Sequence, residues 1–300
     1  MMMFTDTTGS IKEFAKDPAV IKFKGVYYLY YSVFIEEDGQ EKLCIGIATS
    51  NDGENWDIVS RLPLTQECEQ KGIGAPGAIV LGDKVHLFYQ TYGNWETDAI
   101  CHAVSKNGID FVKDESNPIF HPTTDWCIGR AIDADVVVFK DKLFLYYATR
   151  DHKWEIQKVG AAYAPLDSDF SRNAWTQAVT HAVVEPEHPW EGKCIEAPAT
   201  IVDNDAIYMF YGGAYNCAPQ QIGCAVSKDG VAFNKCFDKP FLTCGKEGEW
   251  NSSESGHPYV FKDDDGKVWL YYQGSNNMGE TWYLSRKEIV LKEGVPYIVE

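Results

Sequence analysis

The sequence predicts an all-β protein, a five-bladed β-propeller with four antiparallel strands in each blade. The first observation is a repeat: a segment ending in an aromatic triplet such as Leu-Tyr-Tyr occurs five times, in copies that begin at residues 17, 75, 133, 197 and 257. The second is the spacing of 58 to 64 residues between copies, which accommodates four short strands. The third is composition, because 17 Tyr, 15 Phe, 9 Trp and 25 Gly favour strands joined by tight turns.

The first two strands of each unit are predicted to form a β-hairpin. A β-branched strand leads through a polar turn into the aromatic strand, as between Val20 and Tyr31 of the first copy. The turn dipeptides of the five copies are Lys-Gly, Gly-Asp, Lys-Asp, Asn-Asp and Asp-Gly. These residue types supply the positive φ angles that tight turns need.

A third strand follows the hairpin clearly in three copies, at residues 44–56, 99–111 and 221–233. There a strand of small and apolar residues runs into Ser-x-Asp-Gly or Ser-x-Asn-Gly and then into Trp or Phe, whereas the third and fifth copies diverge. A short fourth strand is expected after each of the first four third strands, at residues 61–65, 117–121, 181–185 and 239–243.

Five units of about 59 residues nearly account for the chain, so residues 1–300 are expected to form one propeller domain with blades starting near 17, 75, 133, 197 and 257. A β-sandwich and a parallel β-helix are the alternatives. A sandwich rarely shows a repeat of this length, and the repeat of a β-helix is much shorter.

Charge and composition exclude several classes of function. A net charge of −17 disfavours nucleic acid and anionic membranes as partners. No apolar run is long enough to span a membrane, and the first residues resemble no signal peptide, so a cytoplasmic protein is expected. The nine cysteines are scattered without a Cys-x-x-Cys pair, and neither Cys127 nor Cys194 has zinc-ligand spacing, which favours reduced thiols.

The start of the first strand in each unit carries the candidate site. In a propeller this strand is innermost, so its first residues converge on the mouth of the central funnel. The aligned position holds Asp17, Ala75, Asp133, Ala197 with Glu196 one residue before it, and His257. The surrounding residues repeat while this position varies among ionisable groups, which favours one asymmetric site. The alternative is that the acids cap strand ends or turns.

Three carboxyl groups in one funnel indicate acid–base chemistry, because repulsion and burial raise the pKa of at least one of them. Glycoside hydrolysis needs such a pair, one protonated carboxyl and one carboxylate. Trp95, Arg150 and Trp154 follow the aromatic strands of the second and third copies and are candidate sugar contacts. Packing within loops or between blades is the alternative for each of them.

Three segments, at residues 16–32, 130–150 and 194–213, together resemble glycoside hydrolase family 43, within a wider group of propeller glycosidases that includes families 32 and 117. The resemblance spans the chain from Asp17 to beyond His257. It implies that Asp17 is the general base, that Asp133 orients substrate and tunes the acid, and that Glu196 is the general acid. It also implies that His257 holds a central water or calcium ion, and that Arg286 contacts the sugar and the acids.

The sequence departs from the family pattern in places. The third copy reads Asp-Ala-Asp, so Asp135 competes with Asp133, although Asp133 is the residue aligned with Asp17. Asn-Asp-Pro-Asn-Gly and Arg-Asp-Pro, which would mark a family 32 fructosidase with a nucleophilic Asp, are missing from the sequence. The resemblance therefore favours an inverting enzyme.

The expected activity is release of a terminal pentose, as an arabinofuranoside or a xyloside, from an oligosaccharide or glycoside. The alternatives are a propeller glycosidase for galactose, anhydrogalactose or fructose units, and a propeller that binds carbohydrate or protein without catalysis. No cofactor is expected to be required. A calcium ion in the central channel, held by His257 through water, is the one metal that the resemblance allows.

Overall fold

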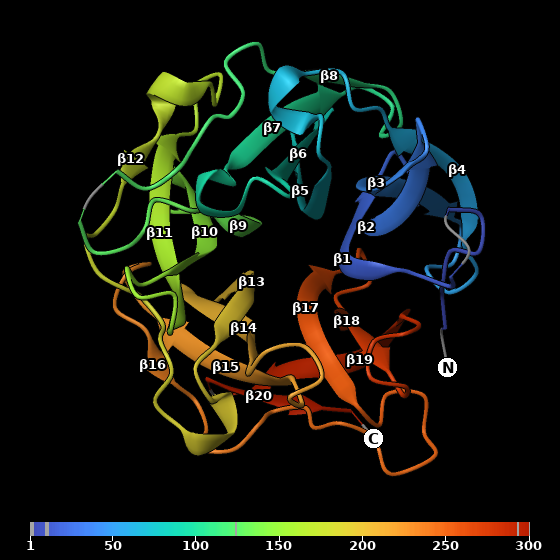
Figure 1. Cartoon of the computed structure of the whole chain (residues 1–300). Helices are drawn as coiled ribbons and strands as arrows, with labels where there is room; N and C mark the ends of the chain where they lie inside the picture. Colours follow the sequence, from blue (N-terminus) through green and yellow to red (C-terminus); the bar gives the residue numbers. More distant parts are fainter. Residues whose placement is uncertain (1–2, 10–11, 124, 293, 300) are drawn as a thin grey trace.

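The structure, a computed structural model, describes residues 3–9, 12–123, 125–292 and 294–299. It confirms the predicted fold: five four-stranded antiparallel sheets surround one axis (Figure 1). In every sheet the strands lie in chain order, and the first strands β1, β5, β9, β13 and β17 contact one another around the centre.

The strands of the first three blades are β1 (Lys16–Phe23), β2 (Val26–Glu37), β3 (Gln40–Ser50), β4 (Asp57–Leu62), β5 (Ile73–Leu81), β6 (Lys84–Thr91), β7 (Ile100–Ser105), β8 (Phe111–Lys113), β9 (Ile132–Phe139), β10 (Lys142–Arg150), β11 (Gln157–Pro165) and β12 (Thr176–Gln177). Those of the last two are β13 (Ile195–Asp203), β14 (Ala206–Gly213), β15 (Gln221–Ser227), β16 (Asn234–Lys235), β17 (Glu254–Lys262), β18 (Val268–Ser275), β19 (Tyr283–Lys292) and β20 (Val295–Ile298). Within the described residues, four short 3₁₀ turns lie between them, at Glu67–Glu69, Trp95–Thr97, Arg172–Ala174 and Pro189–Glu191.

The fourth strands are not where the sequence pattern placed them. β8 and β16 form soon after the turn that ends the third strand, and β12 follows a longer loop with a 3₁₀ turn; all three begin several residues before the predicted segments. The predicted segments at 117–121, 181–185 and 239–243 pair with the third strand only through single bridges. A proline in two of these segments lacks the N–H that a ladder requires. In the first blade, β4 overlaps the predicted segment 61–65 by only two residues.

The turns between the third and fourth strands join neighbouring blades. The hydroxyl oxygens of Ser50, Ser105 and Ser227 each accept a hydrogen bond from the glycine N–H three residues on, at 2.9 Å. A tyrosine of the preceding blade then donates to the carbonyl of that glycine, as Tyr30 does to Gly108 at 2.9 Å. The aromatic strands thus supply the packing between blades.

The ring closes between the last blade and the first. The N-terminal segment runs along β19, where Phe4 pairs with Leu284, and Trp282 exchanges backbone hydrogen bonds with this segment. Lys22 of β1 also forms an ion pair with Asp263 at 3.1 Å. These contacts tie together two ends of the sequence.

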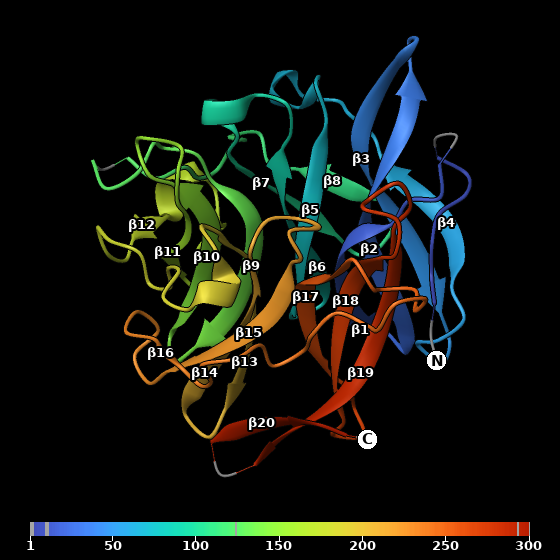
Figure 2. The same ribbon diagram turned by 60° about the horizontal axis from the view of Figure 1, so that its bottom comes forward.

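Two features shape the face on which the first strands begin. β2 and β3 are the longest hairpin, and their tip rises above this face (Figure 2). The loops between second and third strands of the other blades open on the same side. Among the described residues, no helix is both long and apolar enough to cross a membrane.

Candidate active site

A repeated backbone feature presents the site residues. The five aligned residues at the start of the first strands have φ between 39° and 54°, and each lies at a register shift in its hairpin. This left-handed region costs a non-glycine residue about 1–2 kcal/mol. The five residues are Asp17, Ala75, Asp133, Ala197 and His257.

Side chains from neighbouring blades fix all five kinks, and at one of them the N–H of Ala197 donates to Asp133 Oδ2 at 3.3 Å. The N–H groups of Asp17 and Asp133 donate to the side-chain oxygens of Gln273 (3.1 Å) and Gln90 (2.8 Å), and the N–H of Ala75 donates to Ser32 (2.8 Å). The N–H of His257 donates to Gln220 at 3.1 Å. A strained backbone conformation persists only where the surrounding structure holds it in place. The hydrogen bonds from these side chains do so here.

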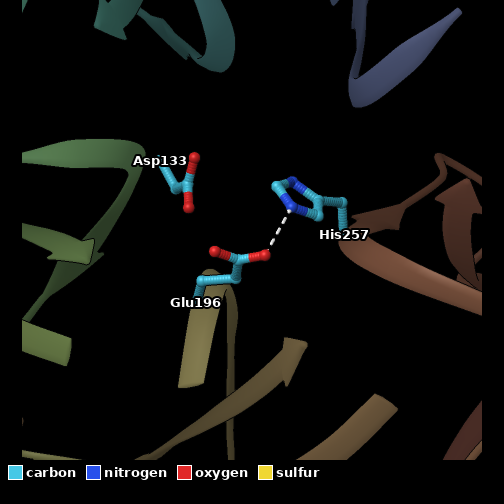
Figure 3. A group of neighbouring side chains, drawn as sticks. All are labelled: Asp133, Glu196 and His257. Atoms are coloured by element: carbon cyan, nitrogen blue, oxygen red, sulfur yellow. Dashed lines mark hydrogen bonds and ion pairs between the residues drawn. The ribbon is translucent and has the colours of Figure 1, made fainter. Parts of the chain in front are cut away.

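The structure brings Asp17, Asp133, Glu196 and His257 together at the funnel mouth. His257 lies between two of the acids: its Nδ1 is 2.7 Å from Asp17 Oδ1, and its Nε2 is 3.2 Å from Glu196 Oε1. Figure 3 shows Asp133, Glu196 and His257 converging from three different strands. All four side chains are largely buried, so their charges interact with little screening.

These contacts set opposite pKa directions for the three carboxyl groups. Burial raises the pKa of Asp17, but His257 and Lys16 outweigh it, so the pKa falls below its usual value. For Glu196, burial is likewise outweighed by His257 and by the Gln220 amide, which donates to Oε1 at 2.6 Å. Burial lowers the pKa of His257, but Asp17 and Glu196 outweigh it and raise this pKa well above its usual value.

Asp133 is the carboxyl group that holds a proton near neutrality. Burial raises its pKa to about 7, with Glu196 and Asp17 adding to the shift while His257 and Arg130 oppose it. The prediction that crowding would separate the acids into protonated and ionised members thus agrees with these pKa directions. In the free site, however, the groups with raised pKa values are Asp133 and His257, whereas the pKa of Glu196 is lowered.

Asp135, the alternative to Asp133 in the sequence, does not contact Glu196 or His257 and has different hydrogen-bond partners. Its Oδ2 accepts hydrogen bonds from the N–H of Thr200 at 2.8 Å and from the hydroxyl of the same residue. It lies beside Tyr259 in the narrow channel beneath the mouth. Asp133, and not Asp135, therefore lines the cavity that contains Glu196 and His257.

A cavity of about 400 Å³ opens above these acids. Phe34 and Leu43 of the long β2–β3 hairpin form one wall, and Tyr92 and Trp282 contribute further aromatic surface. The cavity thus combines aromatic walls with a comparable share of converging polar groups, and aromatic walls with a few placed polar groups are typical of a small-molecule site.

Two cationic residues of this cavity were not among the sequence candidates. Lys16 is half-buried, its Nζ lies 4.5 Å above the Trp282 ring, and Asp17 and Glu254 raise its pKa against the effect of burial. Arg130 precedes β9 and lines the cavity beside Asp133. Lys16 directly precedes Asp17, a signal visible in the sequence, whereas Arg130 lies in a loop without a repeat.

The predicted sugar contacts separate into two groups. Trp95, Arg150 and Trp154 line a second cavity of about 540 Å³, which shares Arg130 with the first. Arg286 lies elsewhere. Its side chain donates to Tyr271 and Glu54 and packs on Trp269, so it links the last blade to the first and lines neither cavity. The sequence located Arg286 in the correct blade but could not show which way it points.

Asp133, Glu196 and His257 each place one potential ligand atom within 4.8 Å of the others, close enough to hold a metal ion together. Both ring nitrogens of His257 already face carboxylates, so the imidazole offers no free nitrogen to an ion or to its water. As the side chains stand, they do not fit calcium held through His257. Calcium in the channel remains a prediction.

Comparison with known proteins identifies the class. The model of glycosyl hydrolases family 43 matches residues 10–293, so the chain belongs to this family. It is a glycoside hydrolase by family, and its substrate is a glycan.

Solved structures agree in fold. A thermostable family-43 glycoside hydrolase superposes with a TM-score of 0.77 at 20% identity, covering 99% of this chain and 96% of the other. An endo-1,4-beta-xylanase from Bacteroides thetaiotaomicron gives 0.72 at 20% identity, covering 95% and 94%. An exo-1,5-alpha-L-arabinanase from a bovine ruminal metagenomic library gives 0.68 at 17% identity, covering 96% and 98%.

Proposed function

We propose that this protein releases a terminal pentose, as an arabinofuranoside or a xyloside, by an inverting mechanism. Glu196 is the general acid, Asp17 the general base, and Asp133 the group that orients the sugar. The observation that carries the proposal is one imidazole ring lying between an oxygen of Asp17 and an oxygen of Glu196. A ring between two carboxyl groups favours the wide separation of about 6.5–9.5 Å that an inverting enzyme needs for its water.

Asp17, the proposed base, is in the ionised form that accepts a proton. The lowered pKa keeps Asp17 ionised, with burial overcome by His257 and Lys16. A water between Asp17 and the anomeric carbon loses its proton to Asp17 as its oxygen attacks. The bond to the leaving oxygen breaks on the opposite face of the sugar, so the configuration is inverted.

The acid must first acquire a proton. In the free site Glu196 is ionised, and His257 carries a proton on the nitrogen that faces it at 3.2 Å. A sugar that fills the cavity excludes water and makes separated charges costlier. We infer that the proton then moves from Nε2 of His257 to Glu196, which passes it to the glycosidic oxygen. Asp133, with a pKa of about 7, can donate a hydrogen bond to a sugar hydroxyl.

Aryl glycosides test the proposal. The expected result is hydrolysis of 4-nitrophenyl α-L-arabinofuranoside or β-D-xyloside, with the inverted anomer seen first by NMR. Preferred hydrolysis of the galactoside would instead favour the alternative sugar class. Binding without turnover of any sugar tested would contradict catalysis. Activity is expected to survive chelation, and a loss restored by calcium would show that the ion is required.

A further inference from the structure

The second cavity, called here the arginine cavity, adjoins the catalytic cavity at Arg130. Its walls include two tryptophans, Trp95 and Trp154, and a second arginine, Arg150. Trp95 leaves 72% of its surface exposed, which is unusual for so large an apolar side chain. The cavity therefore combines aromatic surface with positive charge on a protein of net charge −17.

Arg150 is held in place without an acidic partner. Its Nε donates to Gln157 Oε1 at 2.8 Å, and its guanidinium lies 5.1 Å from the ring centres of both Trp154 and Tyr215. Within the described part of the chain, no carboxylate lies at ion-pair distance from Arg150. Two aromatic rings thus orient the planar group while its outer nitrogens stay available to a ligand.

Arg130 adds a second positive charge. Its guanidinium lies 5.9 Å from the Trp154 ring, and its contact with Asp98 is long at 3.7 Å. Its Nε is buried and finds no hydrogen-bond partner among the described residues. The acid that lines this cavity is Glu96, which accepts a hydrogen bond from Trp154 Nε1 at 3.2 Å. The residues that line this cavity thus include two guanidinium groups and one carboxylate, while Asp98 contacts Arg130 from outside the lining.

A single amide connects the arginine cavity to the proposed acid. Gln157 accepts from Arg150 and donates through Nε2 to Glu196 Oε2. A general acid lies beside the oxygen that leaves, so the sugar beyond the scissile bond lies on the side of Glu196. The arginine cavity is on this side.

We propose that the arginine cavity binds the sugar on the leaving-group side and that this sugar is a uronic acid. Arg150 and Arg130 bind its C6 carboxylate, because the guanidinium fork matches a carboxylate in shape and charge. Trp95 and Trp154 supply an apolar surface for the ring. This inference deepens the proposed function and rests on it for the direction of cleavage.

A matched pair of disaccharides tests the inference. Both carry the same terminal pentose in the same linkage, and the second sugar is galacturonate in one and galactose in the other. The wild-type protein is expected to prefer the uronate by about tenfold or more in kcat/KM, mainly through KM, since hydrogen bonds to charged groups contribute strongly. Arg150→Met is expected to abolish the preference, and Arg150→Lys to keep part of it.

Lys153→Met is the matched control, because it removes one positive charge from the same exposed loop and lines neither cavity. It is expected to keep the preference. Equal kcat/KM for the two disaccharides, or a preference that survives in Arg150→Met, would overturn the inference.

A binding measurement separates this inference from the proposed function. Galacturonic acid and galactose are titrated into the wild-type protein and the Arg150→Met variant by NMR. Tighter binding of galacturonic acid that depends on Arg150 supports the subsite even if no aryl pentoside is cleaved. Equal binding of the two sugars contradicts it even if aryl pentosides are cleaved.

Discussion

Blades two and four are close copies that differ at the funnel mouth. Glu69 and Glu191 are 122 residues apart (191 − 69), and Ala75 and Ala197 keep the same offset (197 − 75). In both blades a fully buried glutamate accepts a hydrogen bond from a tyrosine at 2.8 Å, Tyr89 in one and Tyr211 in the other. The framework around the first strand is therefore the same.

The residue just before the kink is where the two blades diverge. Blade four has Glu196 there, and blade two has Gly74. A Cβ on Gly74 would lie 2.5 Å from a terminal methyl group of Leu43 in the long hairpin, so a side chain at this position would require Leu43 to move. The comparison teaches that repeated residues build the ring, whereas residues that break the repeat carry the chemistry.

The largest effect is expected from the catalytic pair. Glu196→Gln and Asp17→Asn are each expected to lower kcat/KM by about a hundredfold to ten-thousandfold, because proton transfer contributes that much. Both variants should fold but melt below the wild-type temperature, because each removes a carboxylate whose charge the buried His257 stabilises. Near-normal kcat/KM in either variant on a disaccharide, whose leaving group is poor, would contradict its assigned role.

Substitution of the buried framework glutamates, Glu69 and Glu191, should affect the stability of the fold rather than the chemistry at the funnel mouth. Glu191 pairs with Lys235 at 2.6 Å, and Glu69 pairs with Lys113, with both lysines largely buried. Glu69→Ala and Glu191→Ala are each expected to cost about 3–5 kcal/mol in the free energy of unfolding, because a buried lysine loses its partner. Urea denaturation measures this cost, and a large difference between the two variants would show that the blades are not equivalent.

A histidine pair found only in blade two should make the protein acid-sensitive. His86 Nδ1 lies 3.0 Å from His102 Nε2, and burial lowers the pKa of both to about 4. His102 also lies 3.6 Å from Asp114, which opposes its shift. Because both folded pKa values lie below the unfolded value of about 6.5, the neutral pair stabilises the fold above that pH.

This stability should be lost as the pH falls from about 6.5 through 4. Blade four has Tyr208 and Cys224 at the equivalent positions. Installing these residues, as His86→Tyr with His102→Cys, is expected to flatten the pH dependence of the melting temperature over this range. An unchanged slope would exclude the histidine pair as its source.

The smallest effect is expected at the turns that the two blades share. Ser105→Ala and Ser227→Ala each remove a hydroxyl that accepts from a glycine N–H at 2.9 Å. Each should cost about 1 kcal/mol in the free energy of unfolding, the net value of one such bond. Costs that differ by several-fold would indicate that the turns are held differently.

The repeat made the fold and most of the site predictable. Asp17, Asp133 and His257 were located by alignment to Leu-Tyr-Tyr, and Glu196 by its place one residue before the kink. The same alignment contains Gln90. Its side chain accepts a hydrogen bond from the N–H of Asp133 in the next blade, a contact that only the three-dimensional arrangement of the blades reveals.

Other parts needed three-dimensional information. Prolines and early turns shifted the fourth strands, and the direction of the Arg286 side chain depends on how the last blade meets the first. The position of the proton in the free site depends on burial and on His257, which sequence spacing does not report.

The most direct test of the acid–base assignment is the dependence of rate on the leaving group. Pentosides with a good leaving group, such as dinitrophenol, need little help from an acid, whereas those with a poor one need it fully. Glu196→Gln is therefore expected to retain most activity on the dinitrophenyl substrate and lose it on the disaccharide, while Asp17→Asn loses both. Equal losses on both substrates in Glu196→Gln would contradict the account.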